Sequence, residues 1–65
     1  MGIEVIRNEL NFFERVKEEL LKTQRGKFAL IKGEDLVGTF TTAAEAYREG
    51  VRRFGKEPFL IKPVV

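Results

Sequence analysis

The chain has 65 residues, and its 12 Lys and Arg against 10 Asp and Glu leave a net charge of +2. This length limits the chain to a single domain, residues 1–65, and so small a net charge is a weak electrostatic footprint for nucleic acid. Because the chain has no Cys and no His, disulfides are excluded and a zinc or copper site lacks its commonest ligands, so we expect no metal and no cofactor.

The apolar residues follow helical and strand periods in turn. Leu10, Phe13 and Leu20 recur at helical spacing, whereas the run 28–32 is short and bounded by turn residues, which is typical of a strand. The predicted elements, in chain order, are a helix over 9–24, strands over 28–32 and 36–40, a helix over 42–54 and a strand over 59–64. Residues 1–8 form either a very short strand or a flexible arm.

Turn and capping residues support these boundaries. Gly, Glu and Asp at 33–35 separate the first two strands, which predicts a tight hairpin. Thr42 and Glu45 form a capping box that begins the second helix. Pro58 stands at the start of the last strand and Pro63 near its end, which suits a strand at the edge of a sheet.

The element order predicts the fold class. We expect a small α+β domain of order α-β-β-α-β, with two helices packed on a three-stranded, mainly antiparallel sheet. If residues 3–6 also pair with the sheet, the order becomes βαββαβ, a miniature ferredoxin-like fold. The first arrangement is preferred because four residues make a thin strand.

Alternation along the strands separates two faces of the predicted sheet. The first face collects bulky side chains, namely Phe28, Leu30, Leu36, Phe40, Phe59 and Ile61. The second face collects Ala29, Ile31, Val37, Thr39, Leu60, Lys62 and Val64. If both helices pack on the first face, the second is open to water although five of its seven residues are apolar. The alternatives are that the helices lie on opposite faces and cover both, or that β-branched residues simply favour strands.

An open apolar sheet face on a soluble chain indicates an interface. A domain of this size buries only about 60% of the surface that its unfolded chain exposes, and self-association is one common supplement to so small a core. We therefore expect a homodimer, or a complex with another protein, formed through this apolar sheet face or through an exposed strand edge. The candidate interface residues are Ile31, Val37, Leu60 and Val64.

Catalysis is not favoured by the residues available. With no Ser, Cys or His, acid–base or nucleophilic chemistry would fall to carboxylates, Lys, Thr or Tyr47. Glu18 and Glu19 are adjacent on a helix and diverge by about 100°, and the acidic pair Glu34 and Asp35 is ordinary in a turn. We also expect a chain this small to have little room for a pocket of a few hundred Å³. The prediction is that the protein is not an enzyme.

Nucleic-acid binding is the alternative function. Its candidate residues are Arg25, Lys27, Arg48, Arg52 and Arg53. The segment 25–30 loosely follows the aromatic motif of RNA-recognition domains, but Phe28 comes one residue late and Leu30 stands at the second aromatic position. Glu49 is placed to neutralise Arg53 four residues later on the same helix. Solvated helix ends account for these cations more simply.

A set of core and turn residues also carries a family resemblance. The residues are Gly26-Lys27-Phe28-Ala29-Leu30-Ile31, Leu36-Val37-Gly38-Thr39-Phe40-Thr41-Thr42, Glu45-Ala46-Tyr47, Phe54-Gly55 and Pro58-Phe59-Leu60-Ile61. This pattern resembles the DUF5678-like family of short uncharacterised bacterial proteins over about residues 20–65. The resemblance implies a fold and a place beside small retropepsin-like aspartic proteases, but no site residues.

The chain cannot itself be such a protease. Its single Asp, Asp35, is not followed by Thr-Gly or Ser-Gly. The resemblance therefore implies, at most, an inhibitor or antitoxin-like companion of a co-encoded enzyme. With no membrane-length apolar run and no signal peptide in the sequence, we expect a cytoplasmic, non-catalytic protein-interaction module.

Overall fold

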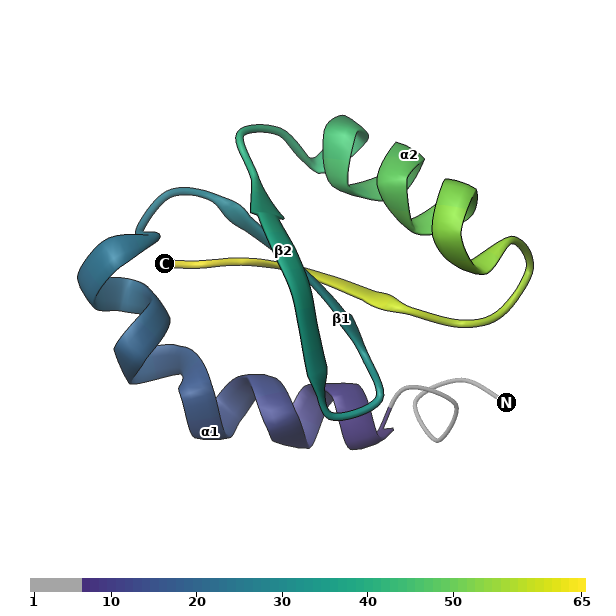
Figure 1. Cartoon of the computed structure of the whole chain (residues 1–65). Helices are drawn as coiled ribbons and strands as arrows, with labels where there is room; N and C mark the ends of the chain where they lie inside the picture. The colour runs from purple at the N-terminus through teal and green to yellow at the C-terminus, as the bar shows by residue number, and fades with distance from the viewer. Residues whose placement is uncertain (1–6) are drawn as a thin grey trace.

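The computed structural model describes residues 7–65, and it confirms an α+β fold of order α-β-β-α-β (Figure 1). The elements are α1 (Arg7–Thr23), β1 (Phe28–Lys32), β2 (Asp35–Phe40), α2 (Ala43–Phe54) and β3 (Leu60–Pro63). Arg7 and Asn8 belong to α1, so the predicted strand or arm over 1–8 is wrong for these two residues. The extra strand over 3–6, on which the ferredoxin-like alternative depends, lies outside the described residues.

The apolar side of α1 packs on one face of the sheet. Phe13 and Leu20 are buried, and Glu9 between them and the helix start is buried as well, with 6% of its surface exposed. The Glu9 carboxylate accepts a hydrogen bond from the Gly33 backbone N–H at 2.8 Å. The first turn of α1 is thereby tied to a hairpin 24 residues later in the chain.

The hairpin between β1 and β2 has the turn that its sequence predicts. Gly33 has φ +65°, a backbone conformation that favours glycine at the first central position of a two-residue turn. From Lys32 opposite Asp35, the antiparallel register runs to Phe28 opposite Phe40. It shifts once on the way, because Leu30 faces Gly38 while Ile31 faces Leu36, and Val37 is left without a partner as a β-bulge.

This bulge changes the face to which the start of β2 belongs. Beyond the bulge the alternation is reset, so Leu36 packs with the cluster under α1 instead of joining Leu30 and Phe40 on the opposite face. The prediction that Leu36 shares a face with Leu30 is therefore wrong. A bulge inserts one residue without leaving a composition signal, which is why simple alternation missed it.

α2 begins and ends where its capping residues predict. The Thr42 hydroxyl accepts a hydrogen bond from the Glu45 backbone N–H at 3.1 Å. At the other end, Gly55 takes a positive φ of 60° and donates its backbone N–H to the Val51 carbonyl. The chain then turns through 56–59 and enters β3.

β3 lies at an edge of the sheet, as Pro63 predicts. The strand order is β2-β1-β3 and every pairing is antiparallel, so β1 is central. Ile61 faces Leu30 and Lys62 faces Ala29 across the β1–β3 ladder. Within residues 7–65, the outer edge of β3 has no neighbouring strand.

The two helices lie on opposite faces of the sheet (Figure 1). Phe13 and Leu20 of α1 form one core cluster with Ala29, Ile31 and Val64. The expectation that both helices share one face and leave the other open is therefore wrong, and the alternative in which each helix covers one face is correct. Neither helix in the described part of the chain combines the length and apolarity needed to cross a membrane.

Candidate functional site

The surface of the described residues has a groove between α2 and β3, which we call the α2–β3 groove. It has a volume of about 710 Å³ and opens broadly to solvent. Its lining comes from α2, from the turn that follows it and from the start of β3, and comprises Tyr47, Val51, Gly55, Lys56, Glu57, Pro58, Phe59 and Ile61. The expectation that so small a chain has little room for a pocket of a few hundred Å³ is wrong.

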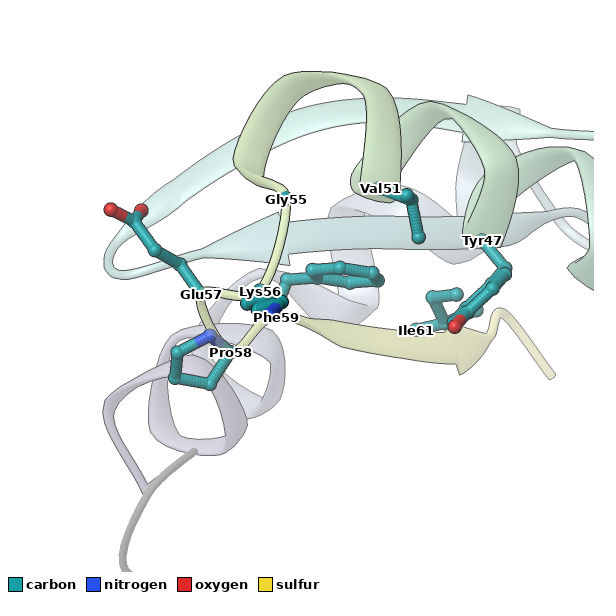
Figure 2. A pocket seen from close by; sticks show the side chains of 8 residues that line it. All are labelled: Tyr47, Val51, Gly55, Lys56, Glu57, Pro58, Phe59 and Ile61. Atoms are coloured by element: carbon teal, nitrogen blue, oxygen red, sulfur yellow. The ribbon is translucent and has the colours of Figure 1, made fainter.

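Apolar side chains make up the centre of the groove. Figure 2 shows Tyr47 and Val51 extending from α2 toward Phe59 and Ile61. Tyr47 is 61% exposed and Val51 is 41% exposed, and apart from Val65 at the chain end they are the large apolar side chains that residues 7–65 leave exposed. Two exposed apolar groups four residues apart on one helix form an apolar stripe that the rest of residues 7–65 does not cover.

A close approach between α2 and Phe59 shapes the floor of the groove. Gly50 presents no side chain, and the Phe59 ring fills the space where one would stand. The ring is held between two other aromatic side chains, because its centroid lies 6.0 Å from the centroids of both Tyr47 and Phe54. Such tilted pairs are favourable geometries, so the floor is a packed aromatic cluster.

Charged groups are confined to one end of the groove. Lys32 of β1 donates a hydrogen bond from Nζ to the Pro58 carbonyl at 2.7 Å and lies 3.6 Å from a carboxylate oxygen of Glu57. These contacts fasten the turn after α2 to the sheet. Figure 2 shows the Glu57 side chain pointing away from the apolar centre. The lining contains one cation and one anion, Lys56 and Glu57, so the groove has no net charge.

Beside the apolar stripe, the outer edge of β3 has backbone groups that find no partner within residues 7–65. Val64 donates its N–H to the Lys27 carbonyl and accepts from the Gly26 N–H, both at 2.8 Å, so its backbone faces inward. Because hydrogen-bonding direction alternates along a strand, Lys62 and Leu60 also face inward toward β1. The backbone N–H and C=O of Ile61 therefore face outward, as does the carbonyl of Pro63, which has no N–H.

Polar side chains are a minority in the lining of the groove. They are a tyrosine hydroxyl, one ammonium and a carboxylate that is paired with Lys32. Within residues 7–65, no three acidic side chains come together as metal ligands would. The arrangement is suited to apolar contact and to backbone pairing.

The structure separates the four predicted interface residues. Ile31 and Val64 are fully buried beneath α1, so they belong to the interior of the folded chain and cannot form a surface. Leu60 is half-buried at the margin of the same cluster. Val37 is half-buried in the bulge of β2, on the opposite edge of the sheet from β3. The correction follows from α1 covering the face that was expected to be open.

The basic residues predicted for nucleic-acid binding come from two separate elements. Arg25 and Lys27 lie in the exposed connection between α1 and β1, whereas the other three lie on α2. Arg52 and Arg53 both donate hydrogen bonds to the Glu49 carboxylate. These bonds, Arg52 first, lower the pKa of Glu49 from 4.5 to about 2. The carboxylate therefore stays ionised and offsets part of the positive charge of this cluster.

Sequence reasoning did not single out Tyr47 as a surface contact residue and therefore missed the groove. A signal was present in the width of the apolar side of α2, whose members are Ala43, Ala46, Tyr47, Gly50, Val51 and Phe54. Small residues on this side, Ala46 and Gly50, are the ones that the structure buries against the sheet. The apolar side of α2 is wider than the part that contacts the sheet. Tyr47 and Val51 lie on the remaining part and stay exposed.

The chain was compared with models of protein families, with curated proteins and with solved structures, and none of them matches it. The resemblance to the DUF5678-like family therefore stays a prediction, and the argument for function rests on the groove.

Proposed function

We propose that the protein is a non-catalytic protein-interaction module that self-associates through the α2–β3 groove and the adjoining β3 edge. The observation that carries this proposal is that two exposed apolar side chains, Tyr47 and Val51, lie beside a strand edge that the described part of the chain leaves unpaired. Aromatic anchors in apolar patches and open strand edges are two of the commonest means of protein recognition.

The size of the domain favours a second copy as the partner. Among residues 7–65, the largest fully buried side chains are Phe13, Leu30, Ile31 and Val64, which make a small core for an independent domain. A standard interface removes about 800 Å² from each partner, which is less than a fifth of this chain's 4518 Å² of accessible surface. Joining two grooves would extend the apolar interior without demanding more surface than the chain has.

The charge distribution favours protein over nucleic acid as the partner. The groove lining has no net charge. On α2, Arg52 and Arg53 both donate hydrogen bonds to the Glu49 carboxylate. Nucleic-acid binding depends on free cations that replace counterions on phosphates. A cytoplasmic location and a role as companion of a co-encoded enzyme remain predictions from the sequence, and both are compatible with a binding module.

A pair of matched substitutions tests the proposal. Val51→Glu places a charge in the groove at an exposed helical position where Glu is a better helix former than Val. Val37→Glu makes the same change in the bulge at the opposite edge of the sheet. Sedimentation velocity should show that Val51→Glu abolishes self-association and that Val37→Glu retains it. The reverse result would place the contact on β2 and overturn the assignment to the groove.

A further inference from the structure

We infer that the two copies join by antiparallel pairing of their β3 edges, with Ile61 opposite Ile61 of the second copy. This inference rests on the proposed function, because it specifies how the second copy occupies the α2–β3 groove. The product would be a continuous six-stranded sheet in the order β2-β1-β3-β3-β1-β2. Its two-fold symmetry closes the assembly at a dimer.

The backbone of β3 restricts the registers that are available. Only residues whose hydrogen-bonding groups face outward can bond across the new junction, and within β3 these are Ile61 and Pro63. Two symmetric registers place three of the four β3 residues opposite β3 residues of the second copy. One has its axis at Ile61 and the other has its axis at Lys62.

Hydrogen bonding favours the axis at Ile61. In that register each Ile61 donates its N–H to the carbonyl of Ile61 in the second copy and accepts the reciprocal bond, so both polar groups are paired. With the axis at Lys62, each Ile61 carbonyl would face the nitrogen of Pro63, which has no hydrogen to donate. A polar backbone group buried at a junction without a partner is costly.

Charge favours the same register. An axis at Lys62 would set the two Lys62 side chains directly opposite each other, and like charges at such positions destabilise a sheet. An axis at Ile61 sets each Lys62 opposite Leu60 of the second copy. The Lys62 ammonium already lies 5.7 Å from the centroid of the Phe13 ring on the α1 side, which leaves its aliphatic part free to cover Leu60.

The side chains of the groove complete this junction. Ile61 lies on the α2 side of the sheet and lines the groove together with Tyr47 and Val51 (Figure 2). With the axis at Ile61, the two Ile61 side chains become neighbours on that side. Tyr47 and Val51 of each copy then lie beside the two Ile61 side chains. The interface therefore consists of the paired β3 strands with an α2 helix on either side.

Cysteine cross-linking tests the register directly, because the natural chain has no Cys. Opposed residues of a hydrogen-bonded pair have Cα atoms about 5.5 Å apart, which a disulfide can span. For Leu60 or Lys62 the distance to the same residue of the second copy is about 8 Å, which is beyond that span. The variants are I61C, L60C and K62C, with E34C at the exposed hairpin tip as the control for random collision.

The inference predicts that I61C forms a covalent dimer on mild oxidation, on the order of 100-fold faster than E34C. L60C and K62C alone should match E34C, whereas a mixture of L60C with K62C should cross-link, because those residues oppose each other. Rapid linking of K62C alone would overturn the register while leaving the proposed function intact. A dimer by light scattering in which I61C and the mixture link no faster than E34C would overturn β3 pairing, and a monomer would overturn the proposed function itself.

Discussion

Gly50 lies so close to Phe59 that a methyl group on its Cα would stand 2.5 Å from Cε1 of the Phe59 ring. This contact joins the side of α2 that is buried against the sheet to the floor of the groove. It explains why a residue that weakens helices stands in the middle of a 12-residue helix. The shape of the groove therefore depends on a missing side chain as much as on those that line it.

The first prediction concerns this contact. Gly50→Ala removes a helix-weakening residue, which by itself favours the helix by about 1 kcal/mol. The added methyl group must displace Phe59 from its position between Tyr47 and Phe54, and overpacking of this kind costs about 1–3 kcal/mol. We expect the variant to be less stable than the natural protein in urea unfolding followed by circular dichroism.

The control is the same substitution in a chain that carries Phe59→Ala. Without the ring there is no clash, so Gly50→Ala should then stabilise by about 1 kcal/mol through helix propensity alone. A double-mutant cycle measures the coupling between the two positions. If Gly50→Ala has the same effect in both backgrounds, the proposed role of this contact is wrong.

The second prediction concerns the buried carboxylate of α1. Glu9 accepts the hydrogen bond of Gly33, and its other carboxylate oxygen, Oε1, is buried without a hydrogen-bond partner among residues 7–65. Glu9→Ala leaves the half-buried Gly33 N–H unpaired, which should lower the free energy of unfolding by about 1 kcal/mol or more. Glu9→Gln keeps an acceptor oxygen and should retain most of the stability. Equal losses in the two variants, measured by urea unfolding, would show that the bond contributes nothing specific.

The third prediction concerns acid stability. Bonds from Arg52 and Arg53 lower the pKa of Glu49 to about 2 in the folded chain, against an ordinary value of 4.5. Because the folded pKa is lowered, this contribution is complete above about pH 4.5 and is lost as the pH falls toward 2. Glu49→Gln should remove that part of the pH dependence. Glu18→Gln changes an exposed carboxylate with no ion pair in the described residues, and it should leave the profile unchanged.

The fourth prediction uses Tyr47 as its own reporter. It is the single tyrosine in a chain without tryptophan, so the tyrosine emission arises from the groove alone. Diluting the natural protein should change this emission as the dimer dissociates. Tyr47→Ala should weaken the dimer at least tenfold, because aromatic anchors commonly contribute more than about 1.4 kcal/mol, with little loss of folding stability at a site that is 61% exposed. Emission that does not depend on concentration would contradict a role for Tyr47 in association.

The boundaries of the elements could be predicted because each is marked by local chemistry. Thr42 caps α2 through its hydroxyl, Gly33 permits the hairpin turn, and Pro63 is tolerated at an edge. These are interactions within a few residues, so the sequence contains them directly. The elements over 28–32 and 42–54 accordingly match β1 and α2 to within one residue.

The arrangement of the layers could not be predicted in the same way. The placement of α1 opposite α2 depends on long-range packing of Phe13 against Ile31 and Val64, which no local pattern specifies. The bulge at Val37 then moved Leu36 to the other face. The sequence correctly predicted that the second face of the sheet is apolar. That face is covered by α1 of the same chain, and not by a second molecule. The exposure of Tyr47 and Val51 depends on how closely α2 packs against the sheet, which the sequence of the helix does not specify.

The most direct test of self-association through the groove is the mass of the natural protein in solution. Size-exclusion chromatography with light scattering, over a concentration series at low salt and with a full ultraviolet spectrum, gives that mass. The account predicts a species of twice the 7.5 kDa chain mass, about 15 kDa, that dissociates on dilution and shows no excess absorbance at 260 nm. A mass of 7.5 kDa at every concentration would contradict it, and co-eluting nucleic acid would favour the arginine-based alternative.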